Sequence, residues 1–227
     1  MPFLRRGARP GPIFIVAAFA FALWSFLEVA EEVLDGGAHA FDLTVLNLLG
    51  MHSPSGLGDR PAWMLAMARD ITALGSVTVL GLMVSAVIVF LAIAGRHMTA
   101  LFVLMATTSG VLTMTALKGI FHRPRPELLA HGDYVMLASF PSGHAMVSAL
   151  VYLTLGALLS QLMSSARLKL FVMGAMLILT GLIGISRIYL GVHWPTDVMA
   201  GWAAGTAWAL ACWGAAQWYR IHHGGRA

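Results

Sequence analysis

Charged residues are scarce in this chain, and cysteine is almost absent. Only 11% of the 227 residues are Asp, Glu, Lys or Arg, whereas 59% are hydrophobic. Together with a mean hydropathy of +0.80, this composition excludes a soluble globular domain of this size and indicates a membrane protein. The single cysteine, Cys212, cannot form an intramolecular disulfide, so the fold must be stabilised by helix packing.

The sequence also lacks the short alternating segments of a membrane β-barrel. Its apolar stretches are continuous, which predicts an all-α fold. Crossing the hydrocarbon layer takes roughly 17 to 25 helical residues. Six stretches are long enough, so we predict a polytopic bundle of six transmembrane helices forming a single domain over residues 1–227. The predicted spans cover residues 12–30, 71–95, 98–117, 144–163, 170–186 and 198–218.

The connection between the first two predicted spans is about forty residues long. Pro and Gly residues break it near its middle, which favours short interfacial helices on either side of the break. This 35–70 segment could form a lid or a plain connector. Just before this segment, Glu28, Glu31 and Glu32 lie on one helix face. These carboxylates could form a solvated helix end or take part in gating.

Basic residues near the span ends predict the orientation. They cluster on the side of both termini and of two tight connections, which makes that side cytoplasmic. The residues concerned are Arg5, Arg6, Arg9, Arg96, Arg167, Lys169, Arg220 and Arg226. The first apolar run is too long for a signal peptide, so we expect an uncleaved helix. The net charge of +4 is spread along the chain, which argues against nucleic-acid binding.

Three short polar strings stand out against this background. They occupy residues 118–126 (KGIFHRPRP), 141–144 (PSGH) and 186–197 (SRIYLGVHWPTD). In an alternating six-span layout, each string falls at a helix end on the outer side of the membrane. We therefore expect the three strings to form one site.

The residue types in these strings suit a phosphate ester. The cationic side chains of Lys118, Arg125 and Arg187 can bind phosphoryl oxygens. Ser142 and Gly143 suit a helix N-terminus, whose backbone N–H groups bind anions. Taken singly, each signal is weak: Lys118 could be a helix-end anchor, and the neighbouring Arg123 could contact lipid headgroups.

Two histidines and one carboxylate complete the chemistry. His144 can exchange protons, and a carboxylate at Asp197 could fix the tautomer of His193 and leave its other nitrogen nucleophilic. A metal site is the competing interpretation of His122, His131, His144, His193 and Asp197. Four cations in the same region argue against a metal, because two unit charges at ~4 Å repel by ~4 kcal/mol at an effective dielectric of 20.

Read together, K-x6-RP, PSGH and SR-x5-H-x3-D resemble the three-part signature of the type 2 phosphatidic acid phosphatase family. The resemblance implies that His193 attacks phosphorus and forms a phosphohistidine, that Asp197 orients His193, and that His144 protonates the leaving group. It implies phosphate binding by Lys118, Arg125, Ser142, Gly143 and Arg187, with no metal or organic cofactor.

The resemblance and the apolar composition together predict a lipid phosphatase in a bacterial inner membrane. Its partners would be the bilayer and a lipid phosphate or diphosphate such as phosphatidate, phosphatidylglycerophosphate or undecaprenyl diphosphate, hydrolysed at the extracytoplasmic face. Loop 127–140 and the 35–70 segment would select the headgroup. Two alternatives stay open: a phosphotransferase that uses a lipid or sugar acceptor, and a non-enzymatic lipid transporter or binding protein.

Overall fold

The computed structural model describes residues 11–50, 60–126 and 138–223. Over these residues the regular structure is entirely helical, in agreement with the predicted fold class. The helices are α1 (Pro12–Leu34), α2 (Ala38–Leu48), α3 (Ala62–Ala73), α4 (Val77–Ile93), α5 (His97–Phe121), α6 (Gly143–Gln161), α7 (Ala166–Tyr189) and α8 (Pro195–His223).

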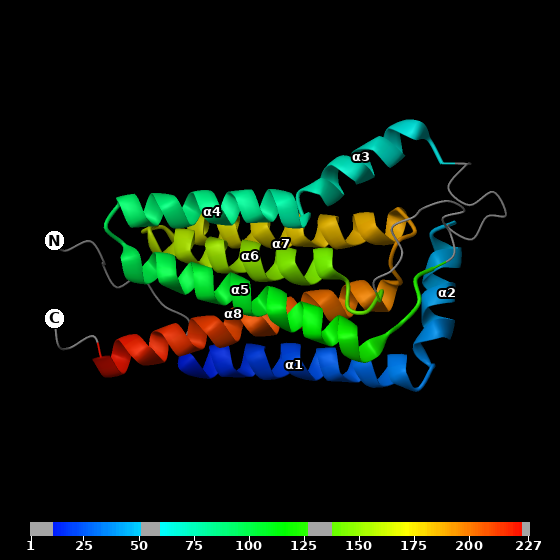
Figure 1. The fold of residues 1–227 in the computed structure, drawn as a ribbon, viewed down its shortest axis with the longest axis horizontal. Helices are drawn as coiled ribbons and strands as arrows, with labels where there is room; N and C mark the ends of the chain where they lie inside the picture. The colour runs from blue at the N-terminus through cyan, green and yellow to red at the C-terminus, as the bar shows by residue number, and fades with distance from the viewer. Residues whose placement is uncertain (1–10, 51–59, 127–137, 224–227) are drawn as a thin grey trace.

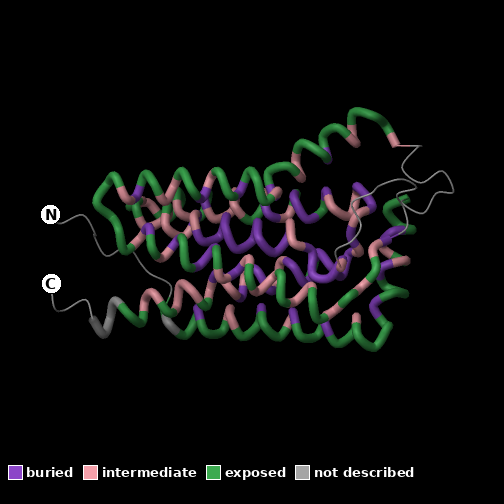
Figure 2. Tube along the Cα trace, viewed as in Figure 1, coloured by how far each residue is buried: buried purple, intermediate pink, exposed green. Residues whose placement is uncertain are grey.

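Helix α6 is the central element of the bundle. It packs against α5, α7 and α8, while α8 also contacts α1 along its length (Figure 1). Burial is concentrated on α6, whereas α1, α4 and α5 expose long faces (Figure 2). Helix α6 can be surrounded because it is apolar on all sides and carries small residues such as Ala145 and Ala149 at its contacts.

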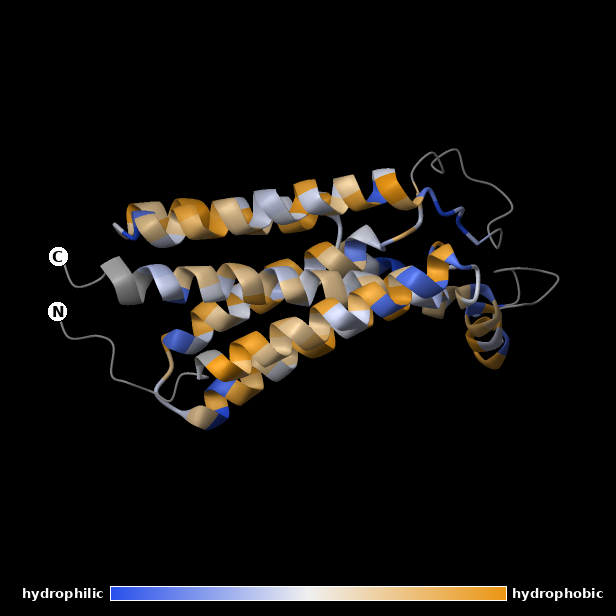
Figure 3. Cartoon of the chain, turned by 90° about the horizontal axis from the view of Figure 1, so that it is seen from below, coloured by the Kyte–Doolittle hydropathy of each residue, from blue (hydrophilic) through white to orange (hydrophobic). Residues whose placement is uncertain are grey.

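Five helical segments of the described chain are long and apolar enough to cross a membrane, with α3 and α4 counted as one of them. Apolar residues dominate the helix shafts, and polar residues lie mainly towards the two ends of the bundle (Figure 3). Large side chains such as Phe14, Phe90 and Ile178 point outwards. Such an apolar outer surface fits a lipid environment, so this is a multi-pass membrane protein.

The sixth predicted span corresponds to α8, which is not among these five segments. Its 29 residues would suffice in length, but Gly, Ala and Trp make up much of the helix and give it a lower hydropathy than Leu, Ile and Val would. Inside the bundle this composition serves close packing instead of contact with lipid.

The second predicted span, expected to be continuous over residues 71–95, is interrupted. Helix α3 ends at Ala73 and α4 begins at Val77, where the Ser76 hydroxyl caps the new helix by accepting from the Val79 N–H at 3.2 Å. Apolar composition alone could not reveal this break. Helices α2 and α3 occur where short helices were expected, but part of the intervening segment, 51–59, lies outside the described residues.

The chain direction brings the motif-bearing helix ends together. The start of α1, the end of α8 and the α4–α5 and α6–α7 connections share one end of the bundle (Figure 1). The end of α5, the start of α6, the end of α7 and the start of α8 lie at the opposite end, beside α2. All three polar strings therefore begin or finish there.

Glycines let α6 and α8 approach closely. A Cβ at Gly201 would lie 2.7 Å from the Ser142 carbonyl oxygen, and one at Gly205 would collide with the Met146 carbonyl. The GxxxG pair thus packs within the chain. On α7, Gly184 faces the Trp202 ring in the same way, whereas Gly181 faces open space.

This packing generates a prediction about stability. Gly205→Ala should lower the apparent melting temperature in detergent, because the clash is with backbone atoms and overpacking typically costs about 1–3 kcal/mol. Gly181→Ala is the matched control, and it should leave the melting temperature unchanged or raised, since Ala favours a helix and finds no neighbour there. Equal melting temperatures for the two variants would contradict close α6–α8 packing.

Candidate active site

The first polar string contributes two cations from different local structures. Lys118 lies in the last turn of α5, and its Nζ donates to the Ala138 carbonyl at 2.6 Å. The helix ends at Phe121, and the next residue, His122, adopts a left-handed φ of 42°. The extended stretch that follows carries Arg125, whose Nη1 donates to the Val192 carbonyl at 2.8 Å. Arg125 therefore reaches across to the turn before α8.

The second string forms the start of α6. Ser142 occupies the N-cap position, but its side chain makes no capping hydrogen bond. Its hydroxyl is buried and finds no hydrogen-bond partner among the described residues. Gly143 lies beside the Lys118 side chain, since a Cβ there would be in ordinary contact with Met114 Sδ at 3.4 Å and with Lys118 Cε at 3.6 Å. Lys118 therefore lies next to the first turn of α6, whose N–H groups have no acceptor within the helix.

The third string places His193 in the turn before α8, with Pro195 as the first helical residue. Asp197 Oδ2 lies 3.4 Å from His193 Nδ1 and accepts from the Trp194 N–H at 3.0 Å. The other ring nitrogen, Nε2, lies 3.3 Å from Arg125 Nη1. Arginine can only donate, so this geometry makes Nε2 the acceptor and leaves the proton on Nδ1, facing Asp197.

His193 is almost completely enclosed, and only 2% of its surface is exposed. Burial lowers the pKa of His193 to about 4, although the hydrogen bond and the charge of Asp197 raise it, because desolvation outweighs them and Arg125 and Arg187 add to the lowering. The imidazole is therefore neutral at neutral pH. A neutral ring with a bare Nε2 is the form that can act as a nucleophile.

Arg187, near the end of α7, and His144, in the first turn of α6, lie close to each other in the site. Arg187 donates to the Thr72 hydroxyl at 3.2 Å, while its buried Nε has no partner among the described residues. The charges of Lys118, Arg125 and Arg187 all act on the His144 ring. The break between α3 and α4 closes one side, since a Cβ at Gly75 would lie 3.4 Å from His144 Cδ2.

All eight predicted site residues thus lie at one end of the bundle, on four helix ends and two loops. Positive side chains lie around two imidazoles, together with the Ser142 hydroxyl and the Arg187 Nε–H, which have no partner among the described residues. Such a site favours an oxyanion with several oxygens.

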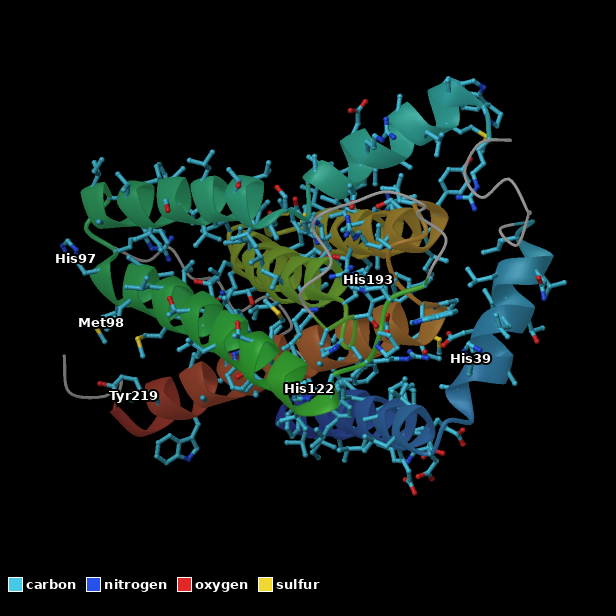
Figure 4. The ribbon with its side chains drawn as sticks, turned by 45° about the vertical axis from the view of Figure 1, so that its right-hand side comes forward. His39, His97, Met98, His122, His193 and Tyr219 are labelled. Carbon is cyan, nitrogen blue, oxygen red and sulfur yellow. The ribbon has the colours of Figure 1, made fainter. Side chains whose placement is uncertain are left out.

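The competing interpretation was a metal site. The described residues contain no group of three or more His, Cys, Asp or Glu side chains able to hold an ion. His122 is exposed at the end of α5, away from the bundle interior where His193 lies (Figure 4). His131 falls outside the described residues.

Three further residues at the site were not assigned a role from the sequence. Arg123, for which the sequence left a headgroup contact open, points inwards and donates to Asp197 and to Asp42 of α2. Thr196 contacts both Arg123 and Asp42. Asp42 carried no signal, because a lone carboxylate on a short helix resembles a surface residue. Its burial is apparent only in the folded chain.

Comparisons with known proteins identify relatives of this chain. The family model of the PAP2 superfamily matches residues 98–221. A phosphatidylglycerophosphatase B of Bacillus subtilis is 29% identical over 151 residues, covering 64% of this chain and 72% of the relative. An undecaprenyl-diphosphatase of Sulfolobus acidocaldarius is 40% identical over 68 residues, which span only 30% of this chain and 29% of that protein.

Two solved structures share the fold. The crystal structure of a transmembrane PAP2-type phosphatidylglycerolphosphate phosphatase from Bacillus subtilis superposes with a TM-score of 0.70 at 25% identity, covering 89% of this chain and 96% of the other. LpxE of Aquifex aeolicus gives a TM-score of 0.51 at 26% identity over 69% of this chain and 88% of the other. The family match covers more than half of the sequence and contains all three polar strings, so the chain belongs to the PAP2 superfamily.

Proposed function

We propose that this protein is a membrane lipid phosphatase that releases phosphate from a lipid phosphomonoester or diphosphate through a phosphohistidine on His193. One observation carries the proposal above the others. The Nε2 of a neutral, buried imidazole faces a guanidinium at 3.3 Å while its Nδ1 faces a buried carboxylate. The nucleophilic nitrogen of His193 thus faces a cationic group that can bind an anion.

The phosphoryl group would be held before it reacts. Lys118, Arg125 and Arg187 would bind its oxygens, and the Ser142 hydroxyl and the Gly143 N–H would supply neutral donors. The unpartnered Ser142 hydroxyl and Arg187 Nε support this assignment, because buried donors without acceptors are costly unless a ligand satisfies them. These donors would also stabilise the charge that spreads over the oxygens in the transition state.

In the first step, His193 Nε2 forms a bond to phosphorus while the bond from phosphorus to the oxygen of the leaving group breaks; the leaving group is the lipid alcohol of a monoester or the lipid phosphate of a diphosphate. With the anionic phosphate bound among the cations, His144 begins as an imidazolium and gives its proton to that departing oxygen. The proton on His193 Nδ1 stays in place, and Asp197 stabilises the ring as it becomes positively charged.

In the second step, water attacks phosphorus and the bond between nitrogen and phosphorus breaks. His144, now neutral, takes the proton from the water. Inorganic phosphate leaves, and His193 returns to its starting tautomer. Each proton is accounted for within the site.

The membrane setting favours a lipid substrate. The site lies at a helix end of a bundle with an apolar outer surface, where a phosphorylated headgroup would sit while its chains stay in the bilayer. The names of the relatives suggest phosphatidylglycerophosphate and undecaprenyl diphosphate, and phosphatidate is a third candidate. The distribution of basic residues supports cytoplasmic termini and an extracytoplasmic site.

A phosphate-release assay tests the function directly. Purified protein in detergent should release inorganic phosphate from at least one of phosphatidate, phosphatidylglycerophosphate and undecaprenyl diphosphate. Vanadate should inhibit the reaction, and EDTA should leave it unchanged. His193→Gln should lower the rate by at least about 10³-fold, since the whole covalent route is lost. Absence of release from all three lipids, or an active His193→Gln variant, would refute the proposal.

The acid role of His144 has its own signature. His144→Gln should slow esters with poor, aliphatic leaving groups by about 10²–10⁴-fold, the usual contribution of general acid catalysis. A substrate with a p-nitrophenol leaving group needs little protonation, so its phosphoenzyme should form with a much smaller loss. The comparison uses single-turnover rates, and equal losses for both leaving groups would remove His144 from this role.

A further inference from the structure

A buried ionic network lies behind the proposed nucleophile. Asp42 on α2 and Asp197 on α8 are both fully buried, and the Arg123 side chain between them is 11% exposed. Arg123 Nη1 donates to Asp197 Oδ1 at 2.7 Å, and Nη2 donates to Asp42 Oδ2 at the same distance. One guanidinium thus joins two carboxylates from opposite ends of the sequence.

Thr196 closes the network into a ring. Its hydroxyl accepts from Arg123 Nη1 at 2.8 Å and donates to Asp42 Oδ2 at 2.7 Å, while its backbone N–H donates to Asp42 Oδ1 at 2.9 Å. Both oxygens of Asp42 are therefore occupied. Asp42 cannot shift without breaking the hydrogen bonds at the first turn of α8.

The network also determines how Asp197 lies. Asp197 Oδ1 is held by Arg123, which leaves Oδ2 for the Trp194 N–H and for His193 Nδ1. Without Arg123, the carboxylate could rotate about its side-chain torsion and lose its alignment with the imidazole. A hydrogen-bonded partner behind a catalytic carboxylate commonly fixes such a group.

We propose that Arg123 and Asp42 are positioning residues: Arg123, anchored by Asp42, orients the Asp197 carboxylate towards His193 Nδ1. This inference rests on the proposed function, because it assigns His193 the role of nucleophile. Asp42 lies outside residues 98–221, the part matched by the family model. Helix α2 thus contributes to the site a residue that the three polar strings do not contain.

The charge balance of the network fits this role. Two carboxylates against one guanidinium leave one net negative charge beside His193. When Nε2 binds phosphorus and Nδ1 keeps its proton, the ring becomes a cation, and the network is its buried counter-charge. Asp42 therefore both holds Arg123 and supplies the excess negative charge.

The main alternative is that Arg123 binds the substrate phosphate itself, as proposed for Arg125. The contacts argue against it, since both terminal nitrogens of Arg123 already donate to buried carboxylates. Arg125 instead donates to the Val192 carbonyl and faces His193 Nε2, on the attacking side of the ring. The two arginines lie on opposite sides of the imidazole and can be distinguished kinetically.

The test compares variants of the full-length protein in detergent, using the lipid that the wild type hydrolyses fastest. Arg123→Gln should lower kcat by about 10–100-fold, the usual cost of losing a group that orients a functional residue, while KM and the inhibition constant of inorganic phosphate change by less than threefold. Asp42→Asn and Arg123→Lys should show smaller losses of the same kind.

Arg125→Gln should weaken inhibition by phosphate at least about tenfold, since it removes a charge-assisted hydrogen bond. Arg69→Gln, at an exposed arginine of α3, is the control and should behave as wild type.

A second readout does not depend on turnover. In protein labelled with ¹⁵N-histidine, the Nδ1 proton of His193 should give a protected downfield resonance, identified by its loss in His193→Gln. This resonance should persist in Arg69→Gln and disappear or shift in Arg123→Gln and Asp42→Asn. The inference is therefore tested even if none of the lipids is hydrolysed, which would refute the proposed function separately.

Two results would overturn the positioning role. An unchanged His193 resonance in Arg123→Gln would show that Asp197 keeps its alignment without the network. A tenfold or greater weakening of phosphate inhibition in Arg123→Gln would make Arg123 a direct ligand of the phosphate. If Arg123→Gln fails to fold, the same two measurements on Arg123→Lys and Asp42→Asn decide between these outcomes.

Discussion

Asp197 is the point at which the separate parts of the site are joined. Its carboxylate faces His193, the Trp194 N–H and Arg123, and its backbone carbonyl accepts from the Ser142 N–H at 2.9 Å. One residue therefore links the 118–126, 141–144 and 186–197 segments by direct hydrogen bonds. A carboxylate buried this completely is tolerated only when every oxygen is paired, so the arrangement that satisfies Asp197 is also the one that orients the imidazole.

The bundle explains how such a polar cluster can exist at the end of an apolar protein. The starts of helices α6 and α8, with the residues just before them, carry Ser142, Gly143, His144, His193 and Asp197, and glycine contacts bring the two helices together. Their outer neighbours present apolar faces, while the positive groups meet only where the helices end. Along the helix shafts the backbone hydrogen bonds stay within the helices, so the backbone atoms available for an anion lie at the helix ends.

Much of this could be read from the sequence. Continuous apolar runs predicted helices, and strings at alternate span ends predicted a shared site with cations, imidazoles and a carboxylate. The break at residues 74–76 was missed because Gly75 and Ser76 interrupt a run without lowering its hydropathy much. The inward position of Arg123 and the burial of Asp42 were missed because they depend on how α2 folds back over the start of α8, and no local pattern encodes such a contact.

The central claim is that His193 becomes covalently phosphorylated during turnover. The most direct measurement is a rapid-quench experiment in base, where phosphohistidine survives, with ³²P-labelled lipid phosphate followed by mass spectrometry of the labelled peptide. The account predicts a transient phosphoryl group on His193 that forms before phosphate release. Label on another residue, or release of phosphate at full rate with no labelled protein at any time, would contradict it.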